Sequence, residues 1–193
     1  MIPGINLNAK HKEARSRKAI LEATMMILEN QSYSSLTIEA VASQAGVGKS
    51  TIYRWWEHKA RLVLDTFVMA VESEFVFERN LSVQENFKRQ LEALARILGS
   101  KVGKSTLTIV TENDGIAQEF YSLFLSLKRK EAKQALQAAM EQGEVKRSVN
   151  MDVVLDLLYG PVYFQILIYK KMPDEHYIED LLQHVMQGIS AGV

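Results

Sequence analysis

The sequence contains no cysteine and only three prolines among its 193 residues. Without cysteine the chain has no disulfide bond, no thiolate zinc site, no iron–sulfur cluster and no cysteine nucleophile. Its ten glycines and three prolines are fewer than a fold with many tight β-turns needs. The composition therefore predicts an all-α protein. The segment 105–111 is ambiguous, because its Thr, Ile and Val residues favour strands in an otherwise helical pattern.

Long hydrophobic runs are also missing. The most apolar stretch, residues 157–169, is interrupted by Gly160, Pro161 and Gln165 and is too short to cross a bilayer. The first residues, MIPGINLNAKHKEARSRK, have no apolar segment of the kind found in secretory signals. Together with the lack of cysteine, these features predict a cytoplasmic protein without a membrane partner.

The charge of the chain is balanced overall but unevenly distributed. Twenty-three basic residues match 23 acidic residues, which gives a formal net charge of zero. Residues 1–61 contain nine basic and five acidic side chains, whereas residues 62–193 contain 14 and 18. A basic N-terminal third joined to an acidic remainder predicts two tasks on one chain.

Residues 37–62 have the pattern of a helix-turn-helix. Thr37 precedes a short apolar helix, Gly46 interrupts it, and a second short helix is expected over about 48–55. The outward face of that second helix carries hydroxyl, amide and charged groups of the kind that read a major groove. Short helix pairs with this spacing also occur in proteins that bind no DNA, so the spacing alone leaves both interpretations open.

A family resemblance favours the DNA-binding interpretation. Residues 34–38, 41–42, 45–47, 51–53 and 58–59 resemble the DNA-binding domain of TetR-family transcriptional regulators, and residues 158–164 are similar to a Gly-Pro-containing helix of their C-terminal domains. The resemblance implies an all-helical homodimeric repressor of about nine helices. It implies a three-helix DNA-binding domain at residues 1–57 and a helical effector-binding and dimerisation domain at 58–193. The implied partners are palindromic operator DNA, a second copy of the chain, and an apolar or aromatic small-molecule effector.

The residues expected at the DNA fall into two groups, since phosphate contacts position a protein and base contacts confer specificity. Those expected near phosphates are Thr37, Tyr53 and Lys59. Those expected at base edges are Lys49, Ser50 and Arg54, with Thr51 able to serve either surface. Trp55 either stacks on the sugar-phosphate backbone or packs against the first helix, and the sequence leaves both open.

The second part of the chain is rich in aromatic side chains, which form either ordinary core or a small-molecule pocket. Tyr159 and Tyr163 lie four residues apart and share a helix face, so the opposite face is expected to meet a partner subunit. The predicted effector pocket consists of Phe67, Tyr121, Phe124, Tyr159 and Tyr163. The predicted dimer interface consists of Leu158, Val162, Ile166, Tyr169, Leu181, Val185 and Ile189.

No catalytic constellation is recognisable. The four histidines lack metal-binding spacing, and the sequence has no nucleophile elbow, phosphate loop or dinucleotide fingerprint. We therefore expect no enzyme activity, no metal and no cofactor. Two alternatives to a ligand-released repressor remain: a helical protein-interaction module, and an activator that works without small-molecule induction.

Overall fold

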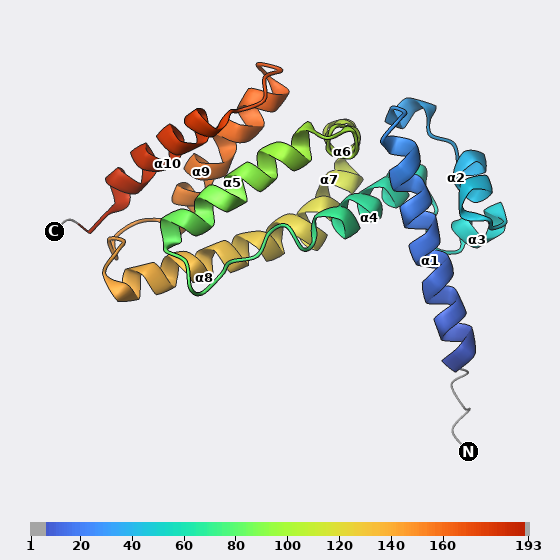
Figure 1. Ribbon diagram of the computed structural model, residues 1–193, viewed down its shortest axis with the longest axis horizontal. Helices are drawn as coiled ribbons and strands as arrows, with labels where there is room; N and C mark the ends of the chain where they lie inside the picture. Colours follow the sequence, from blue (N-terminus) through green and yellow to red (C-terminus); the bar gives the residue numbers. More distant parts are fainter. Residues whose placement is uncertain (1–6, 192–193) are drawn as a thin grey trace. The chain divides into compact units, whose positions relative to one another are not determined.

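The computed structural model describes residues 7–191, and the side chains of residues 11–191. The described chain is helical (Figure 1), and this confirms the predicted all-α fold. The one exception within these residues is an isolated β-bridge between Val145 and Ser190. The α-helices are α1 (Leu7–Leu28), α2 (Ile38–Ala45), α3 (Lys49–Tyr53), α4 (Lys59–Val71), α5 (Val83–Gly99), α6 (Lys101–Glu112), α7 (Asp114–Phe120), α8 (Ser126–Gln142), α9 (Met151–Leu167) and α10 (Glu175–Ile189). A 3₁₀ turn, Tyr33–Ser35, precedes α2, and a π-helical turn, Tyr121–Leu125, joins α7 to α8.

The chain forms two compact units. The first contains residues up to 70 together with 100–117, and the second contains 71–99 together with 118 onward. The first unit therefore includes most of α4 and all of α6 in addition to the three N-terminal helices. The functional boundary between residues 57 and 58 stays a prediction.

The first unit is built around helices that are too short to be stable alone. Helix α2 has eight residues and α3 has five, and both depend on side chains that they bury. Val41 and Ile52 are fully buried, as is Ile20 of α1. Gly46 ends α2 with a left-handed backbone, φ 66°, a conformation that glycine adopts without steric cost. The predicted glycine turn therefore sets how α3 follows α2.

A carboxylate joins three segments of the first unit. Asp65 of α4 accepts hydrogen bonds from Arg17 Nη2 of α1 at 3.0 Å, from Trp56 Nε1 at 3.0 Å and from Arg61 Nε at 2.9 Å. The Asp65 side chain is only 12% exposed, and Trp56 is fully buried beneath the Arg17 guanidinium. Charge-assisted hydrogen bonds of this kind are stronger than neutral ones, so Asp65 fixes α1 and the end of α3 against α4.

Helix α6 resolves the ambiguous segment 105–111. Ser100 caps the helix by accepting a hydrogen bond from the Gly103 amide at 3.0 Å. The threonine hydroxyls donate to carbonyls of the preceding turn, as Thr106 does to Val102 at 3.0 Å. A β-branched residue whose hydroxyl is satisfied in this way is compatible with a helix, and the cap decides the local structure.

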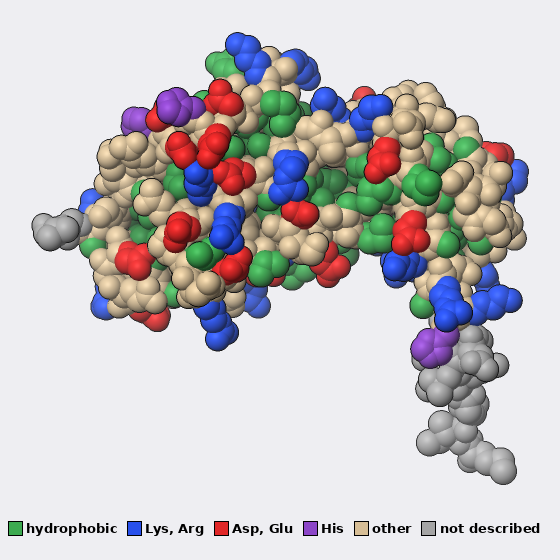
Figure 2. Space-filling view, viewed as in Figure 1, with side chains coloured by type: hydrophobic (Ala, Val, Ile, Leu, Met, Phe, Trp, Pro, Cys, Tyr) green, Lys and Arg blue, Asp and Glu red, His purple; other side chains and the backbone are tan. Residues whose placement is uncertain are grey.

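The second unit is a bundle of α5, α8, α9 and α10, which lie side by side (Figure 1). Its core is apolar and includes Phe87, Leu91, Leu136, Leu155 and Leu158, all fully buried. Acidic and basic side chains are interspersed on the face of these helices that Figure 2 shows. This face of the bundle is therefore solvated.

We predict that Asp65→Ala destabilises the protein by about 1.5–3 kcal/mol, because three donors lose a charged acceptor in a largely buried site. The measurement is urea unfolding followed by tryptophan fluorescence. The matched control is Glu22→Ala, which removes an exposed ion pair with Lys18 and should cost less than about 1 kcal/mol. Equal losses in the two variants would show that Asp65 does not have this role.

Candidate functional site

Helix α3 presents a polar face to the outside of the first unit. Ile52 is fully buried and anchors the helix, while Lys49, Ser50, Tyr53 and Arg54 are exposed. These four positions lie on one side of a helix, at spacings of one, four and five residues. The structure thus brings together the side chains expected at base edges, with Thr51 half-buried beside them. Their contact with DNA stays a prediction.

Helix α2 adds a second element to this surface. Thr37 Oγ1 accepts a hydrogen bond from the Ala40 amide at 3.1 Å and so caps the N-terminus of α2. Glu39 in the first turn forms an exposed ion pair with Lys49 at 2.9 Å. The hydrogen bond from Lys49 lowers the pKa of Glu39, and the same bond raises the pKa of Lys49. This ion pair could not be predicted from the sequence, because the two residues are ten positions apart.

Lys59 and Trp55 have neighbours within the unit. Lys59 Nζ donates to the carbonyls of Tyr33 at 3.0 Å and Leu36 at 2.9 Å, and lies 4.4 Å from the centre of the Tyr33 ring. Two of its three N–H groups therefore hold the 3₁₀ turn against α4, a positioning role that differs from the expected phosphate contact. Trp55 packs edge-on against Trp56 and lies under the guanidinium of Arg54.

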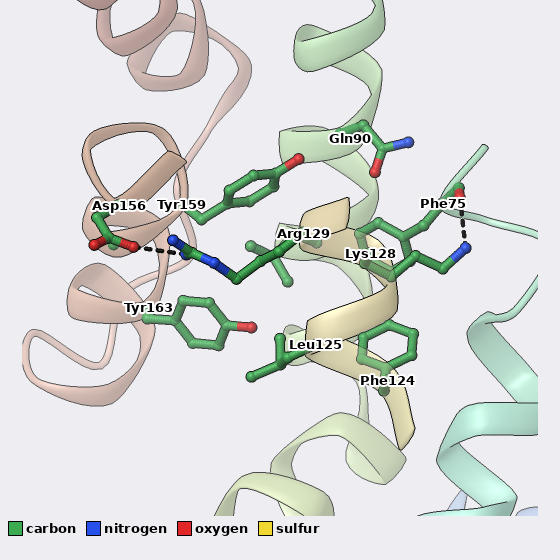
Figure 3. Close-up of a pocket in the computed structure, with 11 residues that line it drawn as sticks. Phe75, Gln90, Phe124, Leu125, Lys128, Arg129, Asp156, Tyr159 and Tyr163 are labelled. Atoms are coloured by element: carbon green, nitrogen blue, oxygen red, sulfur yellow. Dashed lines mark hydrogen bonds and ion pairs between the residues drawn. The ribbon is translucent and has the colours of Figure 1, made fainter. Parts of the chain in front are cut away.

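The second unit contains a cavity of about 300 Å³ between α5, α8, α9 and the segment that follows α4 (Figure 3). Its lining residues are Phe75, Gln90, Leu94, Phe124, Leu125, Lys128, Arg129, Asp156, Tyr159, Gly160 and Tyr163. Three predicted pocket residues, Phe124, Tyr159 and Tyr163, are among them. Phe67 and Tyr121 are not, because Phe67 is buried in the core of the first unit and the Tyr121 side chain is exposed. The structure therefore brings three of the five predicted pocket residues together at this cavity.

Three polar groups of the cavity come from α5 and α9. Gln90 is 2% exposed, and its Nε2 donates to the Val76 carbonyl at 3.1 Å, while its Oε1 points toward the cavity (Figure 3). Burial raises the pKa of the Tyr163 hydroxyl to about 12 and raises that of Tyr159 further. Both hydroxyls therefore stay protonated at neutral pH and can donate hydrogen bonds.

An ion-pair network borders the cavity where α8 meets α9. The Arg129 guanidinium donates to Asp156 Oδ1 at 2.6 Å and to Asp152 Oδ1 at 2.9 Å. Lys133 also contacts Asp152, at 2.7 Å, and these partners lower the pKa of the Asp152 carboxyl. Figure 3 shows Arg129 between the rings of Tyr159 and Tyr163. The sequence did not single out Arg129, since a basic residue in a helix is ordinarily solvated.

Helix α9 has one apolar stripe that faces the core of the bundle and another that points out of it. Val153, Leu157, Phe164 and Ile168 are between 49% and 61% exposed and recur at helical spacing. Tyr169, one of the predicted dimer residues, is also exposed and packs edge-on against Phe164.

Four residues of the predicted dimer interface lie on buried faces of their helices. Leu158, Val162 and Ile166 are buried inside the bundle, as is Ile189 of α10. These four residues have no surface to offer a partner. Leu181 and Val185 are half-buried on α10.

Two family models match the sequence. Residues 20–66 match "Bacterial regulatory proteins, tetR family", and residues 80–185 match "Tetracyclin repressor-like, C-terminal domain". The second match alone extends over more than half of the chain. The chain belongs to the TetR family.

Similar TetR-family proteins cover nearly its whole length. The HTH-type transcriptional regulator YdeS of Bacillus subtilis is 27% identical over 93% of this chain and 92% of its own. The crystal structure of the TetR-family regulator SCO0332 superposes with a TM-score of 0.76 at 29% identity, covering 90% of this chain and 98% of the other. FadR from Bacillus subtilis, solved with stearoyl-CoA, has the same fold with a TM-score of 0.63 at 17% identity, covering 89% and 98%.

These comparisons identify a helix-turn-helix transcriptional regulator. TetR-family regulators bind operator DNA as dimers and respond to small-molecule effectors. In the part of the chain that the structure describes, no helix is long and apolar enough to cross a membrane. Within the same residues, no group of His, Asp or Glu side chains could hold a metal ion.

We predict that Glu39→Gln strengthens DNA binding by roughly two- to tenfold at low salt, because it removes a negative charge near phosphates and releases Lys49. Fluorescence anisotropy with a labelled operator duplex measures the change. Glu22→Gln, which breaks an exposed pair on α1, serves as the control and should have little effect. Weaker binding by Glu39→Gln would mean that the ion pair positions Lys49 for the DNA.

We also predict an alkaline loss of stability that originates in the cavity tyrosines. Because the folded protein raises the pKa of Tyr163 from 10.0 to about 12, the folded state keeps a proton that the unfolded state releases. Stability therefore falls as pH rises through this window. The double variant Tyr159→Phe, Tyr163→Phe should show a flatter profile there in urea unfolding. Identical slopes in the two proteins would contradict the assignment.

Proposed function

We propose that this protein is a cytoplasmic, ligand-responsive repressor that binds palindromic operator DNA as a homodimer and is released by a small-molecule effector. The observation that carries the proposal is that one chain has an exposed polar recognition face on α3 and a cavity of about 300 Å³ in a separate unit. A protein-interaction module would need neither feature. Membership of the TetR family supports both parts of the proposal.

The outward stripe of α9 supports the homodimer. Four half-exposed apolar side chains on one helix form a surface that a soluble protein ordinarily covers. A second copy would present the same stripe, so a two-fold arrangement pairs like with like. Leu181 and Val185 of α10 lie on the neighbouring helix and would extend the interface. Two recognition helices would then enter successive major grooves, about 34–36 Å apart.

Release by an effector follows from chain continuity. Helix α4 ends at Val71, four residues before Phe75 of the cavity, and α7 runs directly into the π-helical turn that carries Phe124 and Leu125. A ligand in the cavity therefore contacts segments that continue into helices of the first unit. The ligand would weaken DNA binding only if it binds more tightly to the conformation that fits DNA poorly. The loss of DNA affinity would be set by the difference between its affinities for the two conformations. The stearoyl-CoA in FadR shows that this fold holds small molecules in another protein.

The test is selection of genomic fragments by the purified protein, followed by binding and transcription assays on the recovered site. We predict that Leu157→Glu yields monomers in sedimentation and lowers operator affinity at least tenfold, because two half-sites are no longer bound together. Leu127→Glu on α8 is the matched control, since Leu127 is 55% exposed and Leu157 is 52% exposed. It should leave both properties unchanged.

Several outcomes would contradict the proposal. Failure to retain any duplex DNA at low salt would indicate an interaction module. Increased transcription from the recovered promoter would indicate an activator. A Leu157→Glu protein that remains dimeric would show that the α9 stripe is not the interface.

A further inference from the structure

Three polar atoms of the cavity are left without partners. Gln90 donates through Nε2 to the Val76 carbonyl, but its Oε1 faces the cavity and accepts no hydrogen bond from the other residues drawn in Figure 3. The hydroxyls of Tyr159 and Tyr163 likewise have no hydrogen-bond partner among the residues drawn there. Gln90 is 98% buried by its own fold, being 2% exposed, so its oxygen is held in place. Among the residues that the structure describes, no fully buried side-chain nitrogen or oxygen lacks a hydrogen-bond partner. These three atoms are therefore open to the cavity, where a ligand can pair with them.

The charges of the cavity, in contrast, are already paired. Lys128 Nζ donates to the Phe75 carbonyl at 2.8 Å and to Glu131 at 2.9 Å. Arg129 is held between Asp152 and Asp156. A charged ligand would lose its hydration shell on entering the cavity, and the charges that it meets there already have partners of opposite sign. The cavity therefore favours an uncharged ligand.

The remaining walls are aromatic and apolar. Phe75 and Phe124 meet edge to face, with ring centres 5.6 Å apart, and the rings of Tyr159 and Tyr163 flank the opposite side (Figure 3). Leu94 and Leu125 complete this lining. Flat aromatic ligands pack well against ring faces and edges. A volume of about 300 Å³ is at the small end of small-molecule sites, so the ligand is compact.

We infer that the effector is a compact, uncharged aromatic molecule with a hydrogen-bond acceptor for the Tyr159 and Tyr163 hydroxyls and a donor for Gln90 Oε1. Hydroxylated aromatic ketones have this chemistry. The inference rests on the proposed function, because it assigns the chemical class of the proposed effector. The ligand class can be tested by binding measurements on the protein alone, whereas the proposed function also requires DNA.

The test uses meta-hydroxybenzophenone, which has two rings, a ketone acceptor and a phenol donor. Its comparators are meta-benzylphenol, which lacks the ketone, benzophenone, which lacks the hydroxyl, and meta-benzoylbenzoate, which is charged. We expect calorimetry to show that loss of either polar group weakens binding roughly tenfold. The carboxylate should bind at least about a hundredfold more weakly.

Variants assign the two ends of the ligand. Tyr159→Phe and Tyr163→Phe should weaken binding of meta-hydroxybenzophenone but leave meta-benzylphenol unaffected, because only the former has the ketone oxygen that accepts from the two hydroxyls. Gln90→Met should remove the advantage of meta-hydroxybenzophenone over benzophenone. Tyr121→Phe is the matched control, since this exposed tyrosine lies outside the cavity and should bind all four compounds as the unchanged protein does.

The inference is overturned if the carboxylate binds as well as the ketone, if the tyrosine variants affect ketone and methylene compounds equally, or if none of the four compounds binds. Operator anisotropy with and without meta-hydroxybenzophenone separates the two proposals. Binding with the expected pattern but without DNA release would support the ligand class and contradict effector-driven release. DNA release caused only by the charged compound would contradict the ligand class and support the regulation.

Discussion

The position of helix α3 depends on the Asp65 carboxylate and on the buried Ile52. Helix α3 has five residues and no stability of its own. It is held by Ile52 beneath it and, just past its end, by Trp56, whose indole donates to Asp65. The same carboxylate accepts from Arg17 of α1. The exposed side chains of α3 are therefore positioned by a residue of α4, and any movement of α4 at Asp65 changes their support.

Local chemistry explains which parts of the fold the sequence could predict. Gly46 has the positive φ that the turn requires, and Thr37 caps α2, so the helix-turn-helix can be recognised from neighbouring residues. The segment 105–111 was ambiguous because the capping of α6 by Ser100 lies outside it. Its threonines fit the helix only because their hydroxyls donate to the preceding turn.

For helix α9, the spacing of apolar residues does not show which face of the helix is buried. It is apolar nearly all round, so one stripe through Leu158 and Val162 and another through Leu157 and Phe164 both satisfy helical spacing. Only the packing of α5, α8 and α10 decides which stripe is buried.

The lining of the cavity could likewise be predicted only in part from the sequence. Tyr159 and Tyr163 could be found because they share a face, but Gln90 and Arg129 come from other helices. On their own helices these two residues resemble ordinary surface positions.

The π-helical turn at Tyr121–Leu125 has a mechanical consequence. A π turn contains about one residue more than an α turn, so it is an under-wound segment between two regular helices. Rewinding it to α geometry would rotate one flanking helix about its own axis by about 100° relative to the other. Phe124 and Leu125, which line the cavity, lie within this turn. The winding of this turn therefore sets the direction in which two cavity-lining side chains project, so the shape of the cavity depends on helix geometry at this point as well as on side-chain size.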